Sequence, residues 1–386
     1  MAKIPRDRDN DYTRAAASKR QQFISEQTGA SLEHTSQYSF DPDVLTGNIE
    51  HFTGVVQLPV GFAGPMLVNG EHAQGEFYVP LATTEGTLVA SYNRGMRLTR
   101  EAGGITTTVV GDAMQRAPVF KFDSARQARD FGAWIEQHFE DIKAAAETTT
   151  RSGKLRDIEQ HPAGRMLYLR FNYTTGDAGG QNMCGKATLA ACHWIIEHFG
   201  KVWYSLSGNM DTDKKHSTIN AMHGRGKKVI AEITLPRAVL GDLMRVTPER
   251  MFEQRLTSQL GSLIAGAVYN TVHPANGIAS LFIATGQDEA NVAEAHAGFT
   301  YAEVTPAGDY YYSITLPALI VASWGGGTGL PTQRECLEVL GCYGTGKVRK
   351  LAEIVAATVL CGELSLAAAV VSEEWVSSHE DLGRNR

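Results

Sequence analysis

The segment covering residues 118–206 constrains the fold more than any other part of the chain. Apolar residues such as Trp134, Phe139 and Ile142 recur there at helical spacing, while other stretches alternate apolar and polar residues as strands do. We predict, in order, a strand over 119–122, a helix over 124–148, strands over 154–160 and 165–173, a helix over 185–199 and a strand over 202–206. The order β-α-β-β-α-β is typical of a split βαβ, or ferredoxin-like, unit.

This unit differs from a doubly wound dinucleotide-binding sheet, because no G-x-G-x-x-G motif follows a strand. Beyond it we predict a strand over 228–235 and helices over 236–244, 260–269 and 349–375, and we leave 278–283 open between strand and helix. The expected fold is α+β: a helical arm over 1–50, a large α/β domain over 51–117 and 207–386, and an inserted ferredoxin-like small domain over 118–206.

Charge and cysteine content narrow the class of protein. The net charge of −6 argues against nucleic acid as the main partner. An odd count of five cysteines without a dense framework fits a reducing compartment, and the charged N-terminus has no apolar core of a secretion signal. Glu363 interrupts the apolar run 354–371, which we interpret as a buried helix rather than a membrane span. We expect a cytoplasmic protein without a membrane anchor.

Glu85 is the first candidate for chemistry. It lies between two threonines and a glycine, and the flanking segments 77–81 and 88–90 are apolar. If the carboxyl group is buried there, its pKa rises and it can donate a proton near neutral pH. The alternative is an ordinary helix start, with Thr84 as the N-cap and Glu85 placed at the positive end of the helix dipole.

Two further polar clusters are candidates. The run Asp211-Thr-Asp213-Lys214-Lys215-His216 suggests a lysine that an aspartate orients, and such an ammonium can stabilise an oxyanion. Its alternative is a solvated turn with surface ion pairs. Asp288 follows an apolar element, which suggests a cleft, but a helix N-cap explains it equally well.

Two glycine-rich stretches, 176–183 and 325–329, suggest backbone that approaches a phosphate closely, although ordinary turns remain an alternative. His379 near the chain end is either a surface residue or a general acid carried by a mobile tail. The P-loop spacing of 341–347 lacks the following Ser or Thr, and neither a nucleophile elbow nor a metal-site motif is present. We therefore expect no metal.

Taken together, these segments resemble the hydroxymethylglutaryl-CoA (HMG-CoA) reductase family. The resemblance starts at about residue 40, keeps one order and is carried by Leu58-Pro-Val-Gly-Phe-Ala-Gly-Pro-Met, Ala82-Thr-Thr-Glu-Gly, Asp112-Ala-Met-Gln-Arg-Ala-Pro, Gly176-Asp-Ala-Gly-Gly-Gln-Asn-Met, Asp213-Lys-Lys, Gly286-Gln-Asp, Gly325-Gly-Gly-Thr and Ser378-His. The short arm and Asp213-Lys-Lys are similar to the class I form, and the membrane anchor of the animal enzymes has no counterpart.

The resemblance implies two successive hydride transfers from NADPH, which convert an acyl-CoA thioester to an alcohol through a hemithioacetal and an aldehyde. Lys214 matches the lysine that stabilises the carbonyl oxygen, and Glu85 matches the proton donor. Asp288 matches the aspartate that links the two. His379 matches the histidine that protonates the departing thiolate. The matching reaction reduces HMG-CoA to mevalonate and CoA in the pathway to isoprenoids.

The same resemblance implies the binding residues. Those for the acyl group are Arg116, Ser207, Asp213, Lys215 and Asn276. Those along the dinucleotide are Asp177, Ala178, Gly179, Gly180, Asn182, Met183, Gly326, Gly327 and Thr328, with Arg151 placed to meet a 2′-phosphate. The site lies between subunits in this family, so a homodimer or tetramer is implied.

The sequence departs from the family pattern at three places, and the first two leave the acyl group open. His216-Ser-Thr stands where Pro-Ala-Ala is usual, and Arg255 lies near the place of a lysine that grips the substrate carboxylate. Gly179 and Gln181 replace methionines of the cofactor motif. The alternatives are the same chemistry on another β-substituted acyl thioester, and a non-catalytic homologue that binds NADP(H) or CoA.

Overall fold

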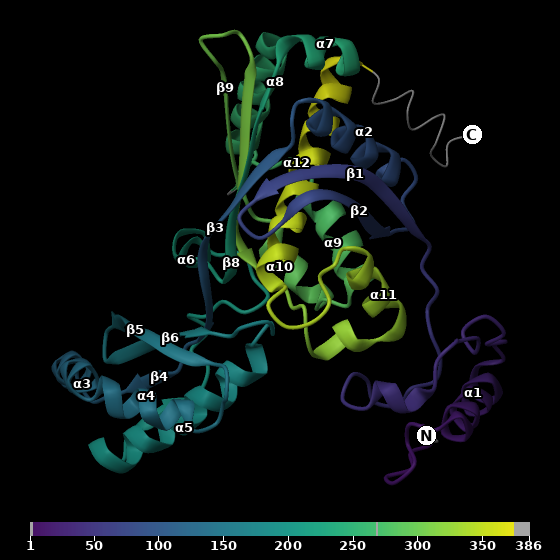
Figure 1. The fold of residues 1–386 in the computed structure, drawn as a ribbon. Coiled ribbons are helices and arrows are strands. Elements are labelled where there is room, and N and C mark those ends of the chain that lie inside the picture. Colours follow the sequence, from purple (N-terminus) through teal and green to yellow (C-terminus); the bar gives the residue numbers. More distant parts are fainter. Residues whose placement is uncertain (1–2, 268, 374–386) are drawn as a thin grey trace.

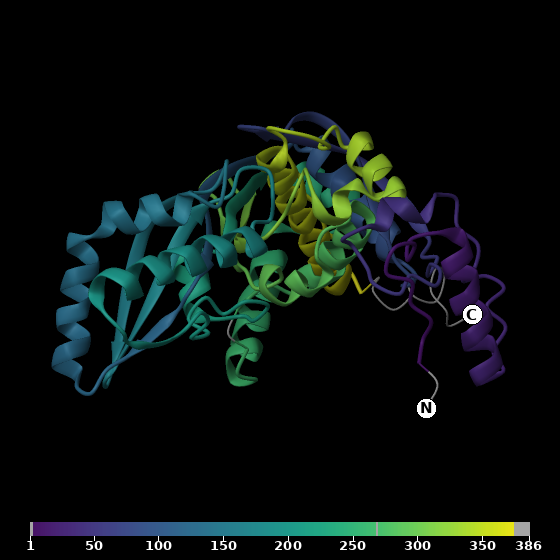
Figure 2. The ribbon, with the colours of Figure 1, turned by 90° about the horizontal axis from the view of Figure 1, so that it is seen from below.

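The computed structural model describes residues 3–267 and 269–373 (Figure 1). Seen from below, the N-terminal arm and the body built around strands β4 (Val119–Lys121) to β6 (Met166–Thr174) lie at opposite ends. The body that holds the long helix α12 (Val348–Val371) lies between them (Figure 2). Each of these three parts has its own cluster of buried apolar side chains. The expected α+β fold with an inserted ferredoxin-like unit is confirmed.

The arm consists of helix α1, Arg14–Thr28, and a short 3₁₀ helix, η1, Pro42–Leu45. The Thr13 hydroxyl accepts the Ala16 N–H at the start of α1, and Gly29 ends the helix with φ 74°. Arg20 is fully buried and donates to the Phe52 carbonyl at 2.8 Å. The arm is thus tied to the segment that leads into the large domain.

The large domain contains one sheet in the order β2-β1-β3-β8-β10-β9. Its strands are β1 Val60–Gly70, β2 Gln74–Ala82, β3 Ile105–Arg116, β8 Gly226–Leu235, β9 Phe299–Val304 and β10 Tyr310–Leu319. Neighbours are antiparallel except β1 and β3, which are parallel. The prediction of a strand over 228–235 is confirmed.

Helices surround α12, Val348–Val371, which runs through the core and packs on α2 and β8. The others are α2 Leu88–Glu101, α6 Thr218–His223, α7 Arg237–Met244, α8 Pro248–Ile264, α9 Pro274–Thr285, α10 Val292–Ala295 and α11 Pro331–Val339, with 3₁₀ turns η2 Glu289–Asn291 and η3 Gly326–Gly329. Although α12 is long and apolar enough to cross a membrane, 83% of its most apolar window is buried in the fold. The prediction of a buried helix is confirmed.

One prediction in this half is wrong, and one alternative that was left open is decided. The helix expected over 260–269 is wrong, because α8 begins at Pro248, where Thr247 caps it, and ends at Ile264. The segment 278–283, left open between strand and helix, belongs to α9.

The small domain has the predicted β-α-β-β-α-β order with one break. Its elements are β4 Val119–Lys121, α3 Ala125–Gln137, α4 Phe139–Glu147, β5 Lys154–Ala163, β6 Met166–Thr174, α5 Gln181–Phe199 and β7 Trp203–Ser205. The sheet order is β7-β4-β6-β5, all antiparallel. The single helix expected over 124–148 breaks at His138, whose Nδ1 lies 2.8 Å from the Trp134 carbonyl oxygen.

Strand β3 connects the two sheets. Residues 106–113 pair with β8 in the large domain, and Met114–Arg116 pair with β6 in the small domain. The end of β3 and the chain segments beside it therefore lie at the junction between the domains (Figure 1). This junction is where the predicted site residues gather.

Substitution of Gly95 can test how closely α2 and α12 cross. A methyl group at Gly95 would lie 2.0 Å from the Cys361 carbonyl oxygen, whereas one at Gly241 in α7 would meet nothing within 4 Å. We expect Gly95→Ala to destabilise the protein by about 1–3 kcal/mol or more. Gly241→Ala, the matched control, should stabilise it by up to about 1 kcal/mol. Urea unfolding measures both, and an unchanged midpoint for Gly95→Ala would contradict the crossing.

Candidate active site

Lys214 and Asp288, taken from two separate predicted clusters, meet in the structure. The Lys214 ammonium lies 2.8 Å from an Asp288 carboxylate oxygen, and the two side chains are 43% and 38% exposed. The hydrogen bond that Lys214 donates to Asp288, together with the charge of that carboxylate, raises the pKa of Lys214. Asp288 also accepts the Ala290 N–H at 3.1 Å, so it caps η2 as the alternative proposed. Its carboxylate therefore does both: one oxygen caps and the other orients an ammonium that a substrate can reach.

Glu85 lies in the loop between β2 and α2. Its N–H donates to the Thr83 hydroxyl at 3.0 Å, and its carboxylate accepts from the Asn276 amide at 3.2 and 3.3 Å. The expectation of a buried carboxyl group is wrong for the single chain, because the strand ends at Ala82 and the apolar flanks do not cover the exposed Glu85. The alternative N-cap at Thr84 is also wrong, since α2 begins only at Leu88.

We also expected Glu85 to lie within hydrogen-bonding reach of Lys214. Among residues 3–267 and 269–373, no hydrogen bond or ion pair joins the two side chains. His379, the fourth predicted catalytic residue, lies outside the described residues.

The predicted acyl-binding residues fall into two groups. Arg116 at the end of β3 pairs with the buried Asp211 at 3.0 Å, and Lys215 donates to the Asp213 carbonyl at 2.9 Å. Together with the exposed Ser207, these residues lie on or beside the loop that carries Lys214. Asn276 lies instead at Glu85, on the first turn of α9.

A cavity of about 570 Å³ collects most of the predicted cofactor residues. It is lined by the loop before α5, by the start of that helix, by Asp288 and by the segment before η3. The predicted cofactor residues that line it are Ala178, Gly179, Gly180, Asn182, Met183, Gly326 and Gly327. Gly180 has φ 83° and immediately precedes α5, so the free N–H groups of a 19-residue helix begin at this wall. The fit to an anionic ligand is therefore good.

Three predicted cofactor residues are placed differently. The Asp177 carboxylate accepts N–H groups of Gly346 and Lys347 at 2.8 and 3.1 Å, and so holds the start of α12. Thr328 is buried and donates to the Gly325 carbonyl at 2.7 Å. Arg151 is exposed in the turn between α4 and β5, outside the walls of the cavity.

Close backbone packing also explains why glycines occur at Gly286 and Gly327, near this cavity. A methyl group at Gly286 would lie 2.2 Å from the Gly327 carbonyl oxygen, and one at Gly327 would lie 2.6 Å from the Gly286 carbonyl oxygen. Two backbone segments therefore touch here, which explains these glycines without a ligand.

The departures from the family pattern are also visible. The Arg255 guanidinium donates to the Thr300 carbonyl in β9 at 3.0 Å. His216 packs edge-on against the Tyr269 ring at 4.9 Å, and burial lowers the pKa of this histidine.

Sequence reasoning missed the buried polar groups behind the loop. Arg225 is fully buried and pairs with Asp213 at 2.7 Å and with Glu294 at 3.0 Å. Gln181 also donates to Asp213, at 3.0 Å. Burial raises the pKa of Glu294 to about 7, against the opposing effect of Arg225. In the sequence, Arg225 is marked only by its place between two glycines, and Glu294 only as an acid within a short apolar helix.

Comparison with known proteins shows the family of this chain. The family model of hydroxymethylglutaryl-coenzyme A reductase matches residues 16–384. The 3-hydroxy-3-methylglutaryl-coenzyme A reductase of Pyrococcus abyssi is 46% identical over 97% of this chain and 94% of its own length. That of Methanocaldococcus jannaschii is 44% identical over 96% of this chain and 94% of its own length. The chain belongs to the HMG-CoA reductase family.

The fold of this HMG-CoA reductase family member is also found among solved structures. A class II 3-hydroxy-3-methylglutaryl-CoA reductase from Streptococcus pneumoniae, bound to NADPH in open conformations, superposes with a TM-score of 0.71. The match covers 94% of this chain and 99% of that one at 22% identity, so it supports the fold alone.

The pair of Lys214 and Asp288 can be tested by titration. We expect Asp288→Asn to lower the pKa of Lys214, because the charge that raises it is lost. The measurement is an NMR titration of the ¹³C-methylated lysine. Glu289→Gln, which removes the same charge from the neighbouring exposed residue, should leave the titration unchanged. The raised pKa also stabilises the fold at neutral pH, and this contribution is lost as pH rises through it.

An identical Lys214 titration in Asp288→Asn and the wild type would show that the pair does not persist in solution.

Proposed function

We propose that this protein reduces HMG-CoA to mevalonate and CoA with two molecules of NADPH. The observation that carries the proposal is the Lys214–Asp288 ion pair at 2.8 Å, with Asp288 in the wall of the cavity of about 570 Å³. An ammonium fixed in place beside a cavity of this kind is suited to a carbonyl whose oxygen becomes negative during reduction. Family membership supplies the substrate.

The proposed division of roles follows the residues. Lys214 stabilises the oxygen of the thioester carbonyl and then of the aldehyde, while Asp288 keeps the ammonium oriented. Glu85 delivers the proton to that oxygen, and His379 protonates the departing thiolate. Arg116, Ser207, Asp213, Lys215 and Asn276 hold the acyl group.

NADPH, when bound, supplies hydride. Ala178, Gly179, Gly180, Asn182 and Met183, with Gly326 and Gly327, would hold it along the cavity wall. Asp177 and Thr328 would support these segments from behind, and Arg151 would meet the 2′-phosphate.

We also propose that the active protein is a homodimer or tetramer with sites between subunits. Glu85 is exposed in the single chain. Nearby strands leave large apolar side chains exposed, including Val60 at 48%, Phe62 at 49% and Tyr78 at 54%. Such side chains on neighbouring strands favour burial against another chain. The five cysteines are all free, which supports a cytoplasmic location.

A second candidate is the same chemistry on another β-substituted acyl thioester. Arg255 favours this candidate. It lies near the place of the lysine that grips the substrate carboxylate in the family, but its guanidinium donates to the backbone of β9. The third reading, a non-catalytic NADP(H)- or CoA-binding homologue, has no need of the Lys214–Asp288 pair.

Purified protein mixed with HMG-CoA should oxidise two equivalents of NADPH for each CoA released, because a thioester needs two hydrides to become an alcohol. Absorbance at the nicotinamide band and a thiol reagent measure the two products. No turnover with HMG-CoA, alongside turnover of a related acyl-CoA, would favour the second candidate.

Lys214→Ala should lower kcat by at least about 10²-fold, because the developing oxyanion loses its ammonium. The fold should survive, since the Lys214 side chain is exposed. Lys201→Ala, which removes an exposed lysine from the small domain, is the matched control. Wild-type kcat in Lys214→Ala would refute the assigned role.

A further inference from the structure

The loop that carries Lys214 has an uncommon backbone. Asn209, Thr212 and Lys214 have φ of 62°, 49° and 56°, in the left-handed region. Residues with a Cβ disfavour this region, so neighbouring groups must hold the loop in place. The position of the Lys214 ammonium depends on this backbone, because the side chain starts from a left-handed residue.

One short segment holds Lys214 at both ends. Asp288 at the start of η2 binds the ammonium at 2.8 Å, and Glu294 in α10 accepts the Lys214 backbone N–H at 2.5 Å. The two acids belong to the same turn of chain after α9. Lys214 is therefore held by its side chain and by its backbone from one short segment, which contains η2 and α10.

Glu294 is also the carboxylate at which buried polar side chains of the junction meet. Its second oxygen lies 3.0 Å from Arg225 Nε and 3.3 Å from the Asn220 amide nitrogen. Both Glu294 and Arg225 have side chains at most 1% exposed. Asn220 in turn donates to the Thr212 hydroxyl at 2.6 Å, one of the left-handed residues.

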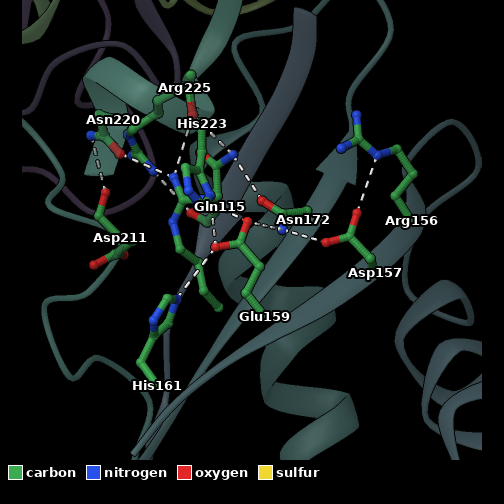
Figure 3. A network of polar contacts seen from close by, with 12 residues as sticks. Gln115, Arg156, Asp157, Glu159, His161, Asn172, Asp211, Asn220, His223 and Arg225 are labelled. Atoms are coloured by element: carbon green, nitrogen blue, oxygen red, sulfur yellow. Dashed lines mark hydrogen bonds and ion pairs between the residues drawn. The ribbon is translucent and has the colours of Figure 1, made fainter. Parts of the chain in front are cut away.

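Arg225 also connects Glu294 to β3, the strand that the two sheets share. It donates to the Gln115 carbonyl in β3 at 3.0 Å and to Asp213, beside Lys214, at 2.7 Å. Figure 3 shows Arg225, Asn220 and Gln115 converging at the junction, with Asp211 on the loop side. Glu294 is thus joined to the loop directly and through two buried side chains.

We propose that Glu294 is a positioning residue for the reduction: through the Lys214 N–H, Arg225 and Asn220 it fixes the backbone from which the Lys214 ammonium reaches the carbonyl oxygen. This rests on the proposed function. Glu294 is buried behind the loop and acts through Lys214, so it is not itself a catalytic residue. A buried ion pair contributes little net stability compared with an apolar replacement, which fits a role in selecting one conformation.

The test compares two variants of Glu294 with a matched control. Glu294→Ala loses both oxygens, whereas Glu294→Gln keeps an acceptor for the Lys214 N–H and loses only the charge. The control is Glu353→Gln: Glu353 is also fully buried and accepts backbone N–H groups, from His72 and Ala73 at 2.9 and 2.6 Å, but in the turn between β1 and β2.

We expect Glu294→Ala to lower kcat by about 10- to 100-fold, as small misplacements of a catalytic group do. KM for NADPH should change by less than about threefold, because the substitution leaves the glycines that line the cavity in place. Glu294→Gln should recover at least half of that loss on a logarithmic scale. Glu353→Gln should lose stability while its kcat stays near that of the wild type.

The proposal is overturned if both Glu294 variants keep wild-type kcat, or if Glu353→Gln loses kcat as strongly as Glu294→Gln. If Glu294→Ala does not fold, the comparison of Glu294→Gln with Glu353→Gln decides alone, with a kcat loss of about threefold or more expected only in the first.

A readout without turnover separates this proposal from the proposed function. The NMR signal of ¹³C-methylated Lys214, assigned by its loss in Lys214→Arg, should shift or broaden in Glu294→Gln and stay in place in Glu353→Gln. An unchanged signal in Glu294→Gln overturns the positioning role even if the protein proves inactive on HMG-CoA. A shifted signal supports the role whichever acyl-CoA is the substrate.

Discussion

The buried guanidinium of Arg225 is the interaction on which the site depends. Removing such a charge from water is costly, and the cost is offset only when its donors find acceptors in a defined geometry. Its partners come from three places: it donates hydrogen bonds to the Gln115 carbonyl in β3 and to Asp213 in the loop, and it forms an ion pair with Glu294 in α10. Because these segments are far apart in the sequence, satisfying one side chain fixes the loop relative to the strand that joins both domains.

The large domain around this junction is held together mainly by apolar packing. Helix α12 is apolar along most of its length and buries that surface against α2 and the sheet. Its two buried acids each tie down a loop, since Glu353 accepts N–H groups of the β1–β2 turn and Glu363 accepts those of Val272 and His273 before α9. Apolar packing thus sets the scaffold, while buried carboxylates fix irregular segments between its elements.

This difference explains what could be predicted from the sequence. The strands and helices of the small domain follow from local periodicity, and even the break at His138 changes only one helix. Lys214 stands out in the sequence because it lies in a run of lysines and aspartates, and Asp288 because it follows an apolar element. Glu85 was expected to be buried, but burial depends on what covers a loop, and flanking apolar residues do not show that. Arg225 and Glu294 were missed because a buried ion pair is defined by tertiary contacts alone.

The site residues of a single chain form two groups that differ in how they are held. Lys214 and Asp288 stand on a buried network that leaves their backbone little freedom. Glu85 and Asn276 hold each other on an exposed loop and the first turn of α9, without a bond to the first group among the described residues. A proton donor must approach the oxygen that the ammonium stabilises. In the proposed function, the buried network defines where that oxygen lies, and Glu85 must reach it from the exposed loop.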